Sequence, residues 1–340
     1  MDRIADILAA LCRVEGVSGA EDAAAEAASI FLEQSSAVQT DRLGNVLGFR
    51  TGGQTGGPRI LLDAHLDQIG LIVTAVTEEG FLRVGACGHM DARVLAAQEV
   101  IVHGSQPLLG VISSVPPHLA KGDESACPDI RDLCVDIGFS GERAAALVPL
   151  GSRVTLLTDP MRLAARRFTG AALDNRAGVA AILRCLEFLD GEATCPLTVL
   201  FSAQEETGGS GAAAAGFSMA PDEAIAVDVS FGQAPGLAPE EAAPLGCGTL
   251  IGWSPVLSRD LSLRLEELAQ TERIPFRREV MGGRTGTNAD RLQVAGTGIP
   301  CGLLSIPLRN MHTGIEVLDL ADSEATAKLL AAYVRDKSRR

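Results

Sequence analysis

The amino-acid sequence predicts an α/β protein whose mostly parallel central sheet is flanked by helices and interrupted by a small inserted β-barrel domain. Two features of the 340-residue chain indicate this fold. Strand-like and helix-like runs alternate in its second half, which is typical of a parallel sheet. Between about residues 71 and 158 the pattern changes to short β-like runs separated by Gly and Pro. A chain of this length exceeds what one compact core usually fills, so we expect one large domain and one smaller domain.

The first elements along the chain are two predicted helices over residues 2–12 and 20–34, where apolar side chains recur at helical spacing. Ser18 is expected to cap the second helix, with Glu21 three residues later completing a capping box. Two strands are predicted next, over residues 41–50 and 59–67. The second strand, RILLDAHLD, is a nearly continuous apolar run, so we expect it to be buried on both faces.

The middle of the chain holds five β-like runs, which are LIVTAV, FLRVG, EVIVHG, GVISSV and CVDIGF. Strands of the main sheet then resume as LTVLFSAQ, AIAVDVS, CGTLIGW and CGLLSIPL. Amphipathic helix-like runs lie between them, including residues 175–190 and 258–270. The main sheet therefore draws its strands from both ends of the chain, and the β domain is inserted between them.

Composition and charge exclude several classes of partner. The net charge of −14, and the lack of a Lys/Arg cluster before the terminal KSRR, disfavour nucleic acid, because phosphate contacts need clustered cations. No apolar run approaches the roughly 18 residues that a bilayer crossing requires, so no membrane partner is expected. The eight cysteines stand singly, and the opening residues lack the pattern of an export signal. We therefore expect a cytoplasmic protein with reduced thiols.

Polar residues that could perform chemistry follow the predicted strands at five places. These residues are His65 with Asp67, Asp174, Glu205 with Glu206, Asp228, and His312. Ligands of an open α/β sheet gather at the carboxyl ends of its strands. Imidazole and carboxylate together suit zinc, cobalt or manganese. The sequence therefore predicts a metal site at this edge of the sheet.

Each candidate also has a structural interpretation. Asp174 could cap a helix, and Asp228 could be a turn residue. The adjacent pair Glu205 and Glu206 favours function more strongly, because two carboxylates at the end of a buried strand are costly to hold together without a compensating cation.

Six motifs occur in order along the chain: AHLDQIG, LDNRAG, AQEETGGSGA, AVDVS, GRTGTNADRLQ and IPLRNMHTGIEVLDLAD. Together with GVISSVPPHL and IRDLCVDIG in the middle segment, they resemble the tetrahedral aminopeptidases of metallopeptidase family forty-two, which include glutamyl and deblocking aminopeptidases. The resemblance implies a zinc-peptidase-like catalytic domain formed by residues 1–70 and 163–340. It also implies that residues 71–162 form an inserted β dimerisation domain.

The resemblance further implies two divalent metal ions per subunit, zinc, cobalt or manganese. Asp174 would bridge the two ions. His65 and Asp228 would complete one site, and Glu206 and His312 would complete the other. The implied activity is removal of N-terminal residues from short peptides by a metal-activated water.

Two more site residues take roles by the same resemblance. Glu205 would act as general base, and Asp67 would orient His65 from outside the metal sites. The segment GGRTGTNAD would lie beside the substrate. Relatives build dimers that assemble into a tetrahedral dodecamer, so a homo-oligomer is expected.

Some residues depart from this pattern. The position after Asp67 is commonly Glu in the family, whereas this chain has Gln68. The change removes one negative charge near the site, which would affect metal affinity. It would be neutral if Gln68 only hydrogen-bonds to a loop. His89, His103 and His118 lie in the inserted segment, away from the six ordered motifs that carry the predicted site residues, and are left out of the predicted site.

Two rival functions remain open. The first is a different amidase or deacylase on the same two-metal scaffold. The second is a non-catalytic, metal-binding oligomeric shell protein. A shell protein would be expected to have lost its general base, and Glu205 is present.

Overall fold

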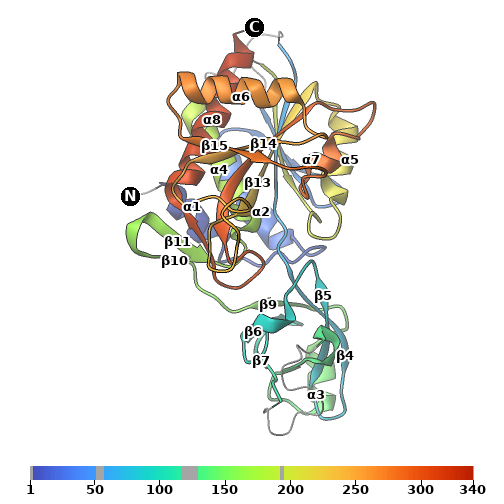
Figure 1. The fold of residues 1–340 in the computed structure, drawn as a ribbon. Coiled ribbons are helices and arrows are strands. Elements are labelled where there is room, and N and C mark those ends of the chain that lie inside the picture. Colours follow the sequence, from blue (N-terminus) through green and yellow to red (C-terminus); the bar gives the residue numbers. More distant parts are fainter. Residues whose placement is uncertain (1–2, 51–56, 116–128, 192–194, 340) are drawn as a thin grey trace.

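The structure is a computed structural model that describes residues 3–50, 57–115, 129–191 and 195–339. Two parts are visible in Figure 1: a large α/β part that contains both ends of the chain, and a smaller β part at one end of it. The chain passes from the first part into the second directly after strand β3 (Ile60–His65) and returns before strand β10 (Met161–Arg162). The predicted fold class, an α/β sheet with an inserted barrel, is confirmed.

Within the described residues the main sheet has 11 strands, and nine of them follow the order β1-β2-β12-β3-β13-β16-β17-β11-β10. The remaining bounds are β1 Ala37–Thr40, β2 Val46–Arg50, β11 Arg167–Gly170, β12 Leu197–Ser202, β13 Glu223–Phe231, β14 Thr249–Trp253, β15 Phe276–Val280, β16 Cys301–Arg309 and β17 Glu316–Asp319. The central strands β12, β3, β13 and β16 are parallel, whereas β1, β2, β17, β11 and β10 pair antiparallel at the two margins. The sheet is therefore parallel where it is buried and mixed toward its edges.

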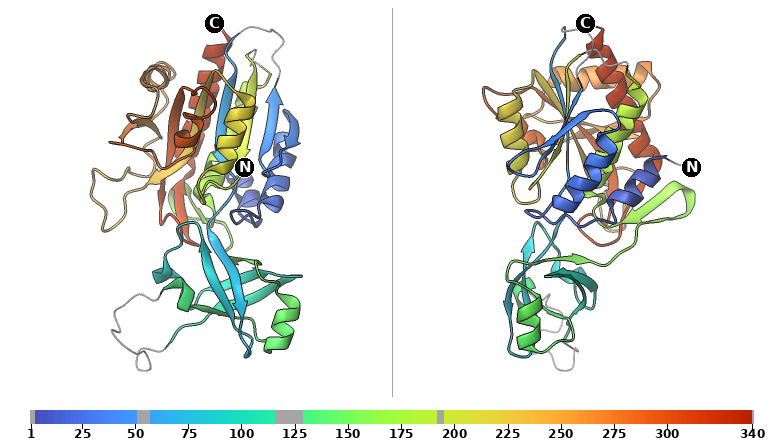
Figure 2. Two further views of the ribbon diagram at one scale, coloured as in Figure 1. Left: turned by 90° about the vertical axis from the view of Figure 1, so that its right-hand side faces the viewer. Right: turned by 180° about the vertical axis from the view of Figure 1, so that it is seen from behind.

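Helices cover both faces of this sheet, as the side views of Figure 2 show. Side chains of α1 (Arg3–Leu11), α2 (Asp22–Leu32), α4 (Leu173–Leu189), α6 (Arg259–Thr271) and α8 (Leu320–Ser338) share the largest core with the sheet. Those of α5 (Ser210–Met219) and α7 (Ala289–Leu292) belong to a second core. Along β3, Ile60 and Leu62 enter the first core and Leu61 enters the second. This strand is thus buried on both faces, as its apolar run predicts.

The inserted part is a closed barrel with the strand order β4-β5-β8-β7-β6-β9. Its strands are β4 Gly70–Val76, β5 Leu82–Cys87, β6 Glu99–His103, β7 Pro107–Ile112, β8 Cys134–Asp136 and β9 Arg153–Leu156, and helix α3 (Gly141–Leu147) packs beside them. Alternate residues such as Val100, Val102 and Val154 fill a core of its own. The barrel therefore has the inward alternation expected of a small closed sheet.

The predicted capping box at the start of α2 is wrong. The cap position is Glu21, and no side chain caps the helix. Ser18 instead shares a hydrogen bond with Thr207 at 2.8 Å, and Glu21 accepts bonds from the backbone N–H groups of Gly19 and Gln204 at 2.7 and 3.1 Å. Ser18 and Glu21 therefore bond to residues of the loop after β12 instead of forming the predicted cap.

The sequence predicts a single strand over residues 41–50. The structure instead has two strands, β1 and β2, which pair antiparallel as a hairpin.

Among the described residues, no helix combines the length and hydropathy needed to span a bilayer.

Candidate metal centre and active site

The central parallel strands end at the same edge of the sheet, next to the barrel, and the predicted site residues lie there. His65 is the last residue of β3, and Asp228 lies in β13 close to the end of that strand. Glu205 and Glu206 follow β12, and His312 follows β16. The structure therefore brings together residues that lie up to 247 positions apart in the chain.

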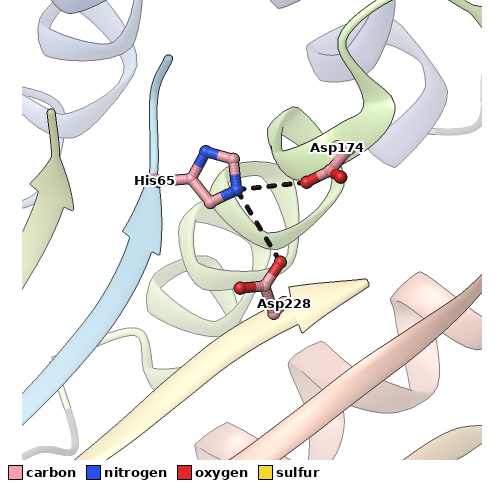
Figure 3. A group of neighbouring side chains, drawn as sticks. All are labelled: His65, Asp174 and Asp228. Atoms are coloured by element: carbon pink, nitrogen blue, oxygen red, sulfur yellow. Dashed lines mark hydrogen bonds and ion pairs between the residues drawn. The ribbon is translucent and has the colours of Figure 1, made fainter. Parts of the chain in front are cut away.

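A first group consists of His65, Asp174 and Asp228 (Figure 3). The Nε2 atom of His65 lies 3.1 Å from Oδ1 of Asp174 and 3.7 Å from Oδ1 of Asp228. All three side chains are almost fully buried. One imidazole nitrogen and two carboxylate oxygens thus converge on one small volume.

A second group consists of Asp174, Glu206 and His312. The Nε2 atom of His312 lies 3.2 Å from Oδ2 of Asp174 and 3.4 Å from Oε1 of Glu206. Asp174 belongs to both groups, and it turns a different carboxylate oxygen toward each histidine. Within each group, the possible ligand atoms lie within 4.8 Å of one another. The arrangement is that of two adjacent ligand sets joined by one carboxylate.

Asp67 lies next to these groups and holds two of their members in place. Its Oδ1 accepts a hydrogen bond from the backbone N–H of Glu205 at 2.9 Å, and its Oδ2 accepts one from Glu206 at 3.1 Å. Its backbone oxygen is 3.0 Å from Nδ1 of His65. Asp67 is itself fully buried. The residue therefore links the end of β3 to the loop that follows β12.

Electrostatics at the site are dominated by buried carboxylates. Desolvation, reinforced by Glu206 and Asp174, raises the pKa of Glu205 to about 7. Burial alone would lower the pKa of His312, but its hydrogen bonds to Asp174 and Glu206 outweigh burial and raise that pKa to about 10. Burial likewise opposes the protonation of His65, and the hydrogen bonds to Asp174 and Asp67 nevertheless raise its pKa well above the ordinary value.

These residues fit divalent cations. Among the ion pairs of the described residues, the carboxylates of Asp174, Asp228 and Glu206 pair only with His65 or His312, and with no Lys or Arg. Buried carboxylates require cationic or hydrogen-bonded partners. Imidazole nitrogen and carboxylate oxygen are the donors that catalytic zinc, cobalt and manganese sites use.

Glu316 is a site residue that the sequence interpretation missed. Its buried carboxylate accepts hydrogen bonds from the backbone N–H of Asp174 at 3.1 Å and of His312 at 2.9 Å. One side chain thus holds the backbone of a member of each group. The available signal was a buried acidic residue at the start of the short strand β17, four positions after His312.

The expectation that His89 lies away from the site is wrong. Its ring is stacked against that of His312, with centroids 6.3 Å apart and an interplanar angle of 10°. Gly88 next to it has a φ of +79°, and a Cβ built there would lie 3.2 Å from Oε2 of Glu206. The end of β5 therefore brings a barrel loop against the second group.

The other two histidines of the insertion differ. His103 shares a hydrogen bond with Thr155 at 2.9 Å and pairs with Glu15, so it lies outside the site as expected. His118 lies outside the described residues.

Gln68 contacts a buried cation. Its Oε1 lies 3.4 Å from Nη2 of Arg176, a fully buried side chain that also donates to the backbone oxygen of Leu66 at 3.0 Å. The backbone of Gln68 pairs with the N-terminal segment through Gly16 and Ser18. The side chain is a neutral acceptor beside the site, and its effect on metal affinity stays a prediction.

A cavity of about 930 Å³ opens from the two groups. His65, Glu205 and His312 line its inner end, and Thr285, Gly286 and Thr287 of the GGRTGTNAD segment line a wall. There is room for a peptide end beside the buried carboxylates.

The sheet, the barrel and the paired imidazole–carboxylate groups define a metal-dependent hydrolase of the α/β class. A family model described as M42 glutamyl aminopeptidase matches residues 44–329. The chain belongs to that family, as its motifs predict, and it is a metal-dependent aminopeptidase.

Individual relatives cover most of the chain. The lysyl aminopeptidase of Pyrococcus furiosus is 31% identical over 306 residues, which are 88% of this chain and 87% of the relative. The structure of aminopeptidase APDkam598 from the archaeon Desulfurococcus kamchatkensis has a TM-score of 0.92 at 29% identity, and covers 98% of this chain and 94% of its own. The structure of the Pyrococcus horikoshii TET1 peptidase, which can assemble into a tetrahedron or a large octahedral shell, has a TM-score of 0.85 at 30% identity. The match covers 97% of this chain and 99% of that peptidase.

Proposed function

We propose that the two groups bind two divalent cations, zinc, cobalt or manganese, with Asp174 as the ligand common to both. The observation that carries this proposal is the position of Asp174, whose two oxygens lie 3.1 and 3.2 Å from the two histidines. His65 and Asp228 complete one site, and Glu206 and His312 complete the other. When bound, the cations supply Lewis acidity, which polarises a carbonyl oxygen and acidifies water.

Glu205 is the general base in this proposal. It lies beside the proposed ligands but belongs to neither group, so its carboxylate is free to accept and release a proton. Its carboxylate takes a proton from the water that attacks the scissile carbonyl carbon. It then delivers that proton to the departing amine as the C–N bond breaks. Asp67 is a positioning residue, because it holds the backbone of Glu205 and the ring of His65.

The substrate is the N-terminal part of a short peptide. Support comes from the cavity, which is lined by His89 of the barrel segment and by residues of the GGRTGTNAD segment. We further propose that residues 71–162 form dimer contacts, that residues 1–70 and 163–340 form the catalytic domain, and that dimers assemble into a tetrahedral dodecamer. The assembly of the Pyrococcus horikoshii TET1 peptidase supports this shell. A cytoplasmic location agrees with the free cysteines of the described residues.

The variant Glu205→Gln tests the general base. It should keep both metals, measured by elemental analysis of the dialysed protein, while kcat on an aminoacyl coumarin amide falls by about a hundredfold or more. Glu33→Gln, at an exposed position after α2, is the matched control. Unchanged turnover in Glu205→Gln would refute the assignment.

The same measurements separate the rival functions. A shell protein would bind metals without hydrolysing any peptide. A different amidase or deacylase would cleave acylated amines but leave a free N-terminal residue in place. The names of relatives disagree on the preferred residue, since one is a lysyl and another a glutamyl aminopeptidase.

A further inference from the structure

Beyond the two metal-binding groups, the cavity wall carries a carboxylate that the chemistry above does not use. Glu279, in the edge strand β15, accepts hydrogen bonds from two serine hydroxyls. Ser305 donates to its Oε2 at 2.6 Å, and Ser230 donates to its Oε1. All three residues line the cavity. The carboxylate is thus held at both oxygens from the side of the sheet.

The positions of the two serines place Glu279 close to the first group. Ser305 is the register partner of Asp228 on the adjacent parallel strand, so its side chain lies about 5 Å away on the same face. Ser230 is two residues beyond Asp228 on β13, which is about 7 Å along the same face. Glu279 accepts a hydrogen bond from each hydroxyl, so its carboxylate lies within hydrogen-bonding distance of both serines. Outward from His65, Asp228 comes first, followed by the serines and then by Glu279.

Charges along the rest of this wall do not cancel that of Glu279. Arg278 is paired with Glu266 at 2.6 Å and lies over the ring of Trp253 at 5.1 Å. The other charged residues of the wall outside the metal-binding groups and Glu205 are Arg277, Glu240 and Glu241. The carboxylates of Glu240, Glu241 and Glu279 therefore outnumber the one remaining guanidinium on this wall, that of Arg277, and the wall favours a bound cation.

We infer that this cavity selects peptides whose N-terminal residue is basic, and that Glu279 is the specificity-determining residue. The inference rests on the proposed function, in which the carbonyl of the first residue lies at the two groups. From there a lysine side chain extends its ammonium on a four-carbon stem toward Glu279. A leucine side chain stops short of the carboxylate. The two serine hydroxyls leave further lone pairs of Glu279 available to an ammonium or guanidinium group.

The test compares lysyl and norleucyl coumarin amides, which share the same four-carbon chain and differ in the charged group. The metal-loaded wild type should show a kcat/KM at least about tenfold higher for lysine than for norleucine, as expected for one charge-assisted hydrogen bond. In Glu279→Gln this ratio should fall toward one. Glu272→Gln, exposed at the end of α6 and outside the cavity, should keep the wild-type ratio.

Two results would overturn the inference. Equal kcat/KM for the two substrates in the wild type would show that the cavity does not select the charge. An equal loss on both substrates in Glu279→Gln, with the ratio unchanged, would show that the carboxylate binds the α-ammonium group instead of the side chain.

Failure of the proposed function looks different, because then neither substrate is hydrolysed. Calorimetry with free lysine and norleucine on the metal-loaded wild type still decides the inference in that case, and also if Glu279→Gln does not fold. Tighter binding of lysine supports it, and equal binding refutes it.

Discussion

The buried carboxylate of Glu316 accepts a hydrogen bond from the backbone N–H of Asp174 at 3.1 Å. Its other oxygen accepts one from the N–H of His312, whose φ of +63° is unusual for a residue with a side chain. The carboxylate thus holds the backbone of Asp174, which both groups share, and that of His312 in the second group, without belonging to either group. Replacing the Glu316 carboxylate should therefore weaken metal binding more than it lowers the stability of the fold.

Glu316→Gln should weaken metal binding by about ten- to a hundredfold, because an amide presents only one acceptor to two backbone donors. Competition with a chromophoric chelator at fixed pH measures this change. The exposed Glu33→Gln should bind metal as the wild type does. An unchanged affinity in Glu316→Gln would contradict the positioning role.

Gly88→Ala should lower both metal affinity and kcat. The new Cβ would lie 2.7 Å from Cγ2 of Ile69 and 3.2 Å from Oε2 of Glu206, so the loop or the carboxylate must move. Gly138→Ala is the matched control, since its φ of +74° imposes a similar backbone strain but no atom lies within 4 Å. Equal losses of activity in the two variants would show that strain alone, and not contact with Glu206, is responsible.

Metal uptake should release protons and tighten as the pH rises. Carboxylate partners raise the pKa of His312 to about 10 and that of His65 well above its ordinary value, so a metal that binds either ring competes with protons for it. A cation must displace these protons, and the apparent affinity should rise by about tenfold per pH unit for each proton released. Calorimetric titrations at pH 6, 7 and 8 in buffers of different ionisation enthalpy measure the protons. Affinity that does not change with pH would contradict the ligand assignment.

Exhaustive chelation should abolish activity and lower the melting temperature, because Asp174, Asp228 and Glu206 then lose the cations that compensate their charges. Adding cobalt, zinc or manganese should restore both properties. Full activity in the stripped protein would exclude the metal mechanism, whatever the melting temperature does.

Much of the site could be predicted from the sequence, for a physical reason. His65, Glu206 and Asp228 each follow or end an apolar run, and parallel strands bring their carboxyl ends to one edge. Assigning Asp174 to both groups required the resemblance to a known family, because its place at the start of α4 is equally that of a helix cap.

The residues that were missed belong to contacts that no local pattern records. His89 reaches the site because the segment after β5 lies against His312, which follows β16 and is more than 200 positions away in the chain. Ser18 and Glu21 match a capping box, yet they bond to Thr207 and Gln204, which lie more than 180 positions away. Glu316 accepts hydrogen bonds from two backbone N–H groups, one at the start of α4 and one in the loop after β16, and periodicity does not reveal such contacts.

The proximity of Gly88 to Glu206 and of His89 to His312 also limits how this protein can be re-engineered. A version trimmed of its insertion to obtain a minimal enzyme would lose a wall of its own reaction chamber. Chimeras between relatives would have to exchange the segment that carries Gly88 and His89 together with Glu206 and His312, so the smallest transplantable catalytic unit includes part of the insertion.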